Sequence, residues 1–120
     1  MNKKILIVDD EPDVRSLICS ILKAERFDVQ DAGDGSSAVD LLKKDGIGLV
    51  LLDIMMPGMD GIETAREMRK FSKVPIVVVS IKADDISEDL IKRLDFAACV
   101  QKPFNTERLL GAVNGAFKTC

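Results

Sequence analysis

Three short apolar runs, each followed at once by a polar side chain, constrain the fold of this chain more than any other feature. The runs are KILIV (4–8), LVLL (49–52) and IVVV (76–79), and Asp9, Asp53 and Ser80 follow them. A short run that is apolar at every position is typical of a parallel strand covered on both faces. The sequence therefore predicts a central parallel sheet with helices on both sides.

Amphipathic segments between these runs predict the covering helices. The first helix should begin at Pro12 and the second should span about residues 35–44. Asp60 with Glu63, and Asp85 with Glu88, have the spacing of a capping box, which predicts an Asp N-cap for the third and fourth helices. The 3.6-residue period predicts the buried faces of the first and last helices, formed by Val14, Leu17, Ile18, Ile21 and Leu22, and by Leu109, Leu110, Val113, Ala116 and Phe117.

Two less apolar segments, residues 27–32 and 97–102, read as edge strands. With right-handed crossovers between sequence neighbours, the simplest strand order is 2-1-3-4-5. The predicted fold is a single α/β domain over residues 1–120, a doubly wound, flavodoxin-like (βα)5 sheet. In such sheets ligands bind outside the carboxyl ends of the strands, at the point where the strand order reverses.

Five polar side chains follow the predicted strands at that edge: Asp9, Asp10, Asp53, Ser80 and Lys102. Each alone has an ordinary explanation as a helix cap, a turn residue or an exposed edge charge. Three neighbouring carboxylates, however, repel one another by a few kcal/mol per pair, so the cluster needs either a raised carboxyl pKa or a cation. Lys102 offsets one charge, and magnesium suits a site that offers only oxygen ligands.

These groups suit phosphoryl transfer to an aspartate. Asp53 ends the most central strand and is the candidate nucleophile, and Lys102 would neutralise charge on the phosphoryl oxygens. Ser80 could donate a hydrogen bond to the product. Asp9 and Asp10 are better placed to hold the metal, while Pro57 and Gly58 are predicted to turn the chain beside the site.

Composition excludes several other functions. The chain has no histidine, which rules out a His-based triad, a histidine metal site and an internal phosphohistidine. A net charge of −3 without a basic block argues against nucleic acid as a direct partner, and Arg66, Arg69, Lys70 and Lys73 read as a solvated helix face. No apolar stretch is long enough for a membrane span or a secretory signal, so we expect a cytoplasmic protein. The three cysteines, Cys19, Cys99 and Cys120, read as reduced thiols, two of them packed as small hydrophobes.

The segments ILIVDDEP, LLDIMMPGMDG, PIVVVS and QKPF, in this order and spacing, resemble the receiver domain of two-component response regulators over the whole chain. The resemblance implies that Asp53 is the phosphorylation site and that Asp10, Asp53 and the Met55 carbonyl bind magnesium, with Asp9 acting through a water. It also implies that Ser80 is the switch hydroxyl, that Lys102 is the site lysine, and that the Lys102–Pro103 bond is cis.

The function implied is a phosphorylation-controlled switch. The donor would be a sensor histidine kinase or phosphotransfer protein, and the domain would catalyse its own phosphorylation and dephosphorylation without being a conventional enzyme. An effector domain or protein would bind the face formed by helix 4, strand 5 and helix 5 and read its conformation. Phosphorylation could also lead the domain to form a homodimer. The chain could also be one receiver domain from a longer regulator. The alternative is a receiver-like interaction module that works without phosphorylation.

Three positions depart from the family pattern. Cys99 stands where a Tyr or Phe is common, Ile81 follows Ser80 where a small residue is usual, and LDFAAC (94–99) replaces the customary Gly-Ala turn, which puts Phe96 near the signalling face. We hypothesise that Ile81 partly shields Asp53 and slows phosphoryl exchange. We also hypothesise that, without the aromatic side chain, the signal passes through residues 80–96.

Overall fold

Five parallel strands and the helices between them alternate along the chain, which is presented here as a computed structural model describing residues 4–44, 46–55 and 60–118. The strands are β1 (Lys4–Val8), β2 (Asp28–Ala32), β3 (Ile47–Leu52), β4 (Ile76–Ser80) and β5 (Phe96–Gln101). The helices are α1 (Pro12–Ala24), α2 (Gly35–Lys44), α3 (Gly61–Arg69), α4 (Glu88–Leu94) and α5 (Thr106–Lys118), and a 3₁₀ turn, η1 (Ala83–Asp85), precedes α4.

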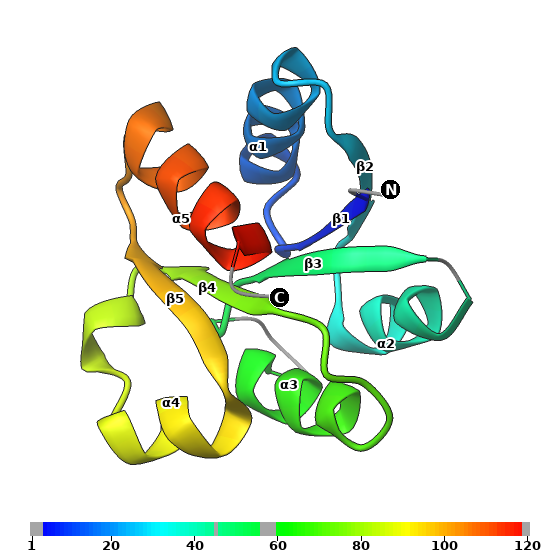
Figure 1. Cartoon of the computed structure of the whole chain (residues 1–120), viewed down its shortest axis with the longest axis vertical. Helices are drawn as coiled ribbons and strands as arrows, with labels where there is room; N and C mark the ends of the chain where they lie inside the picture. Colours follow the sequence, from blue (N-terminus) through cyan, green and yellow to red (C-terminus); the bar gives the residue numbers. More distant parts are fainter. Residues whose placement is uncertain (1–3, 45, 56–59, 119–120) are drawn as a thin grey trace.

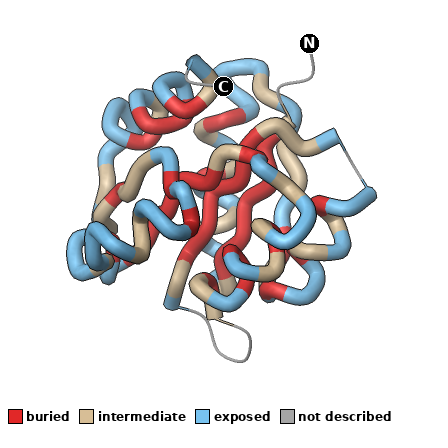
Figure 2. Tube along the Cα trace, turned by 60° about the horizontal axis from the view of Figure 1, so that its bottom comes forward, coloured by how far each residue is buried: buried red, intermediate tan, exposed pale blue. Residues whose placement is uncertain are grey.

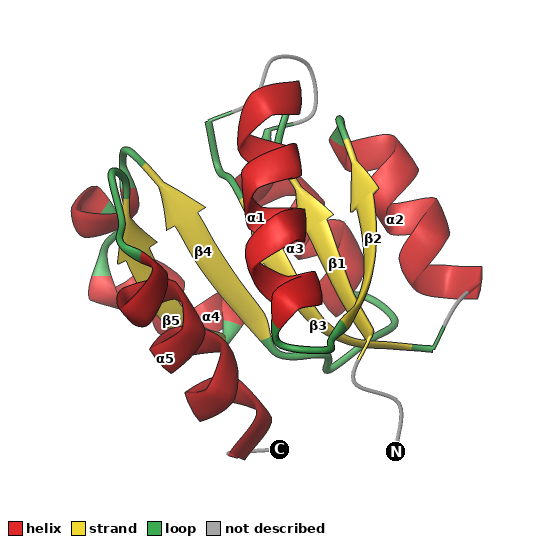
Figure 3. Cartoon of the chain, turned by 90° about the horizontal axis from the view of Figure 1, so that it is seen from above, coloured by secondary structure: helices red, strands yellow, loops and turns green. Residues whose placement is uncertain are grey.

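The sheet order is β2-β1-β3-β4-β5, which confirms the predicted flavodoxin-like topology with β2 and β5 at the edges. Helices α1 and α5 cover one face of the sheet, and α2, α3 and α4 cover the other (Figure 1). All strands run in the same direction, so their carboxyl ends and the loops that follow gather along one edge of the sheet (Figure 3).

The core has two halves, one on each side of the sheet, because neighbouring strand residues point to opposite faces. Ile5 and Ile7 pack with Leu22 of α1 and Val113 of α5, whereas Leu6 packs on the side of α2, α3 and α4. The three central strands are buried along nearly their whole length, as the unbroken apolar runs predict (Figure 2). This rigid sheet supports the side chains at its carboxyl edge.

Three helix starts are confirmed, one of them that of α2 at Gly35, and one is wrong. Pro12 begins α1, and the Asp60 carboxylate caps α3 by accepting a hydrogen bond from Glu63 N at 2.9 Å. The fourth helix is not capped by Asp85, which ends η1; Ser87 caps it instead, accepting from Leu90 N at 3.1 Å. The chain makes an extra turn before α4, so the cap lies two residues later than predicted.

Two side chains lie in environments that the pattern did not predict. Leu17, placed on the buried face of α1 by the helical period, is 55% exposed. Arg69, read as part of a solvated basic face, is half-buried and donates to the carbonyls of Val74 and Leu94, both at 2.7 Å. Arg69 therefore joins the end of α3 to the end of α4, and Arg66 on the same helix remains exposed, as predicted.

The remaining compositional predictions concern thiols and membrane segments. Cys19 and Cys99 are free thiols, half-buried against opposite halves of the core, which confirms the prediction for these two; Cys120 lies outside the described residues. Within the described ranges, no helix has the length and apolar character needed to cross a bilayer.

Candidate phosphoryl-acceptor site

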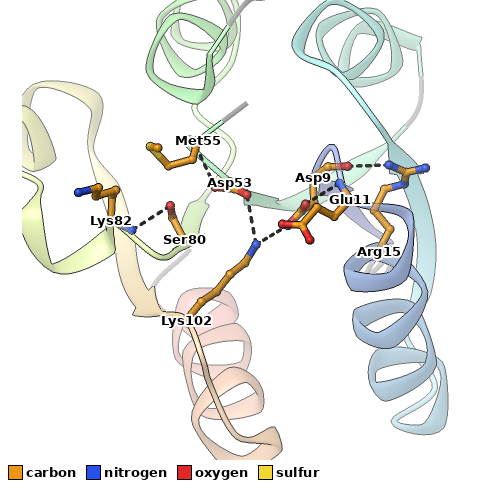
Figure 4. Close-up of polar contacts among 8 residues, drawn as sticks. All are labelled: Asp9, Glu11, Arg15, Asp53, Met55, Ser80, Lys82 and Lys102. Carbon is orange, nitrogen blue, oxygen red and sulfur yellow. Dashed lines mark hydrogen bonds and ion pairs between the residues drawn. The ribbon is translucent and has the colours of Figure 1, made fainter. Parts of the chain in front are cut away.

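Lys102 bridges two buried carboxylates at the carboxyl edge of the sheet (Figure 4). Its Nζ donates to Asp9 Oδ2 at 2.7 Å and to Asp53 Oδ2 at 3.1 Å. Asp9 and Asp53 are only 2% and 4% exposed, respectively. The contact joins β1, β3 and β5, so residues from three separate parts of the chain meet at one point.

The pKa of Lys102 reflects the balance between burial and the neighbouring charges at this contact. Burial opposes the positive charge, but the hydrogen bonds and charges of Asp9 and Asp53 outweigh it and raise the pKa of Lys102. Lys102 is held in place by its own backbone, since its N–H donates to the Ser80 carbonyl at 2.9 Å. The Lys102–Pro103 peptide bond is cis, which confirms that prediction.

Each of the two buried aspartates has its second oxygen fixed by the backbone. Asp9 Oδ1 accepts from Glu11 N, and Asp53 Oδ1 accepts from Met55 N, both at 2.9 Å. Both carboxylates thus bind Lys102 with one oxygen and an amide two residues further along with the other. This pairing holds each side chain in one orientation before any ligand arrives.

Asp10 completes a group of three carboxylates. Asp9, Asp10 and Asp53 each offer an oxygen, and these oxygens lie within 4.8 Å of one another. Three carboxylates beside the one positive charge of Lys102 leave excess negative charge, and hard oxygen ligands of this kind suit Mg²⁺. The residues present therefore fit the magnesium site that the sequence predicts, and Met55 lies next to them on the chain. The turn predicted at Pro57 and Gly58 lies outside the described residues.

Ser80 ends β4 and is fully buried. Its hydroxyl accepts a hydrogen bond from Lys82 N at 3.2 Å, within its own loop (Figure 4). All five residues predicted for this edge, Asp9, Asp10, Asp53, Ser80 and Lys102, thus lie at the carboxyl ends of β1, β3, β4 and β5.

Sequence reasoning missed two residues that support the aspartates. Arg15 of α1 donates through Nη1 to the Asp9 carbonyl at 2.7 Å and through Nε to Asp31 at 2.9 Å. Gly61 lies against the backbone that follows Asp53. A glycine directly after the N-cap Asp60 is the signal that could have identified Gly61, because this position does not require glycine for the helix itself.

An apolar hollow of about 380 Å³ adjoins the site. It is lined by Val14 and Leu17 of α1, Ile81 after β4, and Phe104 after β5, with Lys102 at one wall. Leu17 and Ile81 are both more than half exposed. The hollow therefore places exposed apolar side chains beside the lysine that binds the two buried carboxylates.

The sheet order and the carboxylate–lysine cluster define a CheY-like α/β domain with an acidic site at its topological switch point. A model of the response regulator receiver domain matches residues 5–114. The chain therefore belongs to the response regulator receiver domain family. Receiver domains exchange signals with histidine kinases or phosphotransfer proteins and with effector domains, and they bind Mg²⁺ at an acidic pocket.

Solved structures of similar proteins agree with this assignment. The response regulator TrrA from Thermotoga maritima, in complex with Mg²⁺-BeF, is 33% identical with a TM-score of 0.86, and the match covers 95% of this chain and 98% of that one. The chemotaxis response regulator CheY4 of Vibrio cholerae is 26% identical with a TM-score of 0.88, covering 97% and 99%. The receiver domain of the Francisella response regulator 1452 is 28% identical with a TM-score of 0.85, covering 98% of each chain.

Proposed function

We propose that this receiver domain accepts a phosphoryl group on Asp53 from a phosphohistidine of a partner kinase or phosphotransfer protein, in the cytoplasm. The observation that carries the proposal is the Lys102 contact with both Asp9 and Asp53, which fixes a buried carboxylate beside a cation. The absence of histidine from the chain agrees with a donor on another protein. The donor would approach through the hollow beside Lys102, and the apolar walls of the hollow would contact the donor protein.

In the reaction, an Asp53 carboxylate oxygen forms a bond to phosphorus while the bond from phosphorus to the donor nitrogen breaks, and the electron pair of that bond stays on the nitrogen. Lys102 stabilises the charge on the transferred oxygens because its pKa keeps it protonated. Asp10, Asp53 and the Met55 carbonyl are the groups that would hold magnesium directly, with Asp9 through water. When bound, the ion supplies further charge neutralisation on the phosphoryl oxygens.

The consequence for signalling lies at Ser80. Its hydroxyl oxygen accepts a hydrogen bond from Lys82 N. A phosphoryl group on Asp53 would offer the hydroxyl a charged acceptor, to which it could donate, at the same edge of the sheet. Rotation of Ser80 toward that acceptor would draw the loop after β4 inward and change the face formed by α4, β5 and α5. An effector domain, an effector protein or a second copy of the domain would read this change. Hydrolysis at Asp53, catalysed by the same groups, would end the signal.

A second candidate function is an interaction module that works without phosphorylation. Cys99 is the observation in its favour, since this small, half-buried thiol packs against the core beside α4 and offers no large side chain to change rotamer. The first candidate is favoured because Asp9, Asp10, Asp53, Ser80 and Lys102 lie together at one edge.

Labelling by acetyl phosphate separates the two candidates. We expect Mg²⁺-dependent incorporation of one phosphoryl group, detected by intact-protein mass spectrometry, and its loss in Asp53→Asn or after chelation of the metal. Asp60→Asn is the matched control, because asparagine caps a helix as well as aspartate does and α3 should be unaffected. No labelling of the wild type would support the second candidate. Labelling that persists in Asp53→Asn would show instead that the phosphoryl group goes to a residue other than Asp53.

A further inference from the structure

The Gln101 side chain, at the end of β5, joins the segment that follows Ser80 to the loop that begins at Lys102. Its Nε2 donates to the Ile81 carbonyl at 2.6 Å and to the Lys102 carbonyl at 3.2 Å. Its Oε1 accepts from Asp84 N at 2.9 Å. One amide thus binds both ends of the segment 81–84, which runs from the end of β4 into η1, and also the backbone of the neighbouring loop.

The chemistry of these partners fixes the orientation of the amide. Two partners are carbonyl oxygens, which can only accept, and the third is a backbone N–H, which can only donate. Turning the amide over would place its oxygen against both carbonyls and its NH₂ group against the N–H. Glutamine therefore fits here in one orientation, and neither an acid nor an apolar residue can make the same three bonds.

Gln101 also lies at the right place in the sheet to affect Ser80. The two residues are register partners of β4 and β5, and Ser80 receives its hydrogen bond from Lys82 N, inside the segment that Gln101 holds. Any movement of the Lys82 amide away from Ser80 has to move this segment. Such a movement breaks or rearranges the Gln101 bonds to Ile81 and Asp84.

We propose that Gln101 is a positioning residue that holds residues 81–84 in place and so keeps the Ser80 hydroxyl bonded to Lys82 rather than free to turn toward Asp53. This proposal rests on the proposed phosphorylation of Asp53. Gln101 stabilises the unphosphorylated arrangement. The free energy of its three hydrogen bonds is part of the cost of the conformational change that follows phosphorylation. When the hydrogen bonds of Gln101 break, a movement of the loop after β4 is passed on to β5. This route for the signal needs no aromatic side chain at position 99.

The first test needs no phosphoryl group. In Gln101→Met, which keeps the length of the side chain but none of its polar atoms, the Asp84 amide loses its partner. We expect its hydrogen exchange, measured by NMR, to become about tenfold faster. Gln101→Glu keeps an acceptor for Asp84 but sets a carboxylate against two carbonyls, so it should also loosen the segment. Gln30→Met makes the same change on β2, at the opposite edge of the sheet, and should leave Asp84 unchanged.

The second test measures the dissociation constant for beryllium fluoride in the presence of MgCl₂, which mimics the phosphoryl group. We expect Gln101→Met to bind about 3- to 10-fold more tightly than the wild type, corresponding to the loss of one net hydrogen bond. This sign distinguishes the proposal from a general structural role, because a disturbed site would bind more weakly. Gln30→Met should bind as the wild type does.

The outcomes separate the two proposals. Binding that is equal or weaker in Gln101→Met, with normal binding by the wild type, would overturn the role of Gln101 and leave phosphorylation of Asp53 standing. No binding by the wild type would count against phosphorylation instead. In that case unchanged Asp84 exchange in both Gln101 variants would show that Gln101 does not hold the segment, and faster exchange would show that it does.

Discussion

A Cβ atom at Gly61 would lie 2.3 Å from the Asp53 carbonyl oxygen and 2.3 Å from the Ile54 Cα atom. Both contacts are with backbone, which cannot rotate away as a side chain can. The first residue of α3 thus packs directly on the chain that carries the candidate nucleophile, and only glycine leaves room for it.

Gly61→Ala should therefore move the backbone at Asp53 and lower the free energy of unfolding by about 2 kcal/mol, as for other overpacked sites. Urea denaturation measures the loss, and the amide chemical shifts of residues 53–55 report the displacement. Gly111→Ala and Gly115→Ala are controls in α5, where a Cβ atom meets nothing within 4 Å, and each should gain about 0.5–1 kcal/mol. Full stability of Gly61→Ala with unmoved shifts would contradict the tight packing.

Arg69→Met should also destabilise the domain. The guanidinium binds the carbonyls of Val74, Leu94 and Asp95, and burial lowers its pKa without removing its charge. Methionine fills part of the volume but leaves these carbonyls without their donor, so we expect a loss of about 2–3 kcal/mol in urea denaturation. Arg66→Met, on the exposed face of the same helix, should change stability by less than about 0.5 kcal/mol. Equal effects of the two substitutions would contradict a specific role for Arg69.

Ile81→Ala should speed both phosphorylation and dephosphorylation of Asp53. Ile81 lies on the wall of the hollow beside Lys102 and is 58% exposed, so shortening it widens the approach for donor and water. The rates with acetyl phosphate, followed by mass spectrometry, should rise several-fold. Phe71→Ala removes an exposed apolar side chain at the end of α3 and should leave both rates unchanged. Unchanged rates in Ile81→Ala would show that Ile81 does not shield Asp53.

The thiols of Cys19 and Cys99 should react slowly at neutral pH. Burial, and then the charges of Asp31 and Asp84 respectively, raise the pKa of each thiol, and only the thiolate reacts with iodoacetamide. Because the folded pKa lies above the unfolded one, the protonated thiols favour the folded state at neutral pH, and this contribution is lost as pH rises through the folded pKa. In a Cys120→Ser background, labelling rates from pH 7 to 10 should lag behind those of the urea-unfolded chain. Coincident pH profiles would contradict the shift.

The sheet and its site residues were predictable because local sequence determines both. An apolar run buried on both faces needs no knowledge of distant residues, and the polar residue that follows it must lie at the carboxyl edge. The order of the strands then brings Asp9, Asp53, Ser80 and Lys102 together without further information.

The errors occurred where a distant contact decides between local alternatives. Asp85 and Glu88 have the spacing of a capping box, but the extra turn that leaves Ser87 as the cap is tied to Gln101, 17 positions beyond Asp84. Arg69 reads as a surface charge until the carbonyl of Leu94, 25 positions later, lies beside it. The helical period of α1 predicts a wider apolar face than the one that the helix packs against the sheet. Leu17 lies on the part of that face that remains exposed.

The ion pair between Lys102 and Asp9 joins residues 93 positions apart. During synthesis on the ribosome, the candidate acceptor Asp53 and the acidic residues near it emerge long before the lysine that neutralises them. A partial chain that ends before residue 102 presents the carboxylates without their cation and without β5 to complete the sheet. The contact of Lys102 with Asp9 and Asp53 therefore forms only after nearly the whole domain has been synthesised. A chain that ends before residue 102 lacks this site and cannot act as the complete domain would.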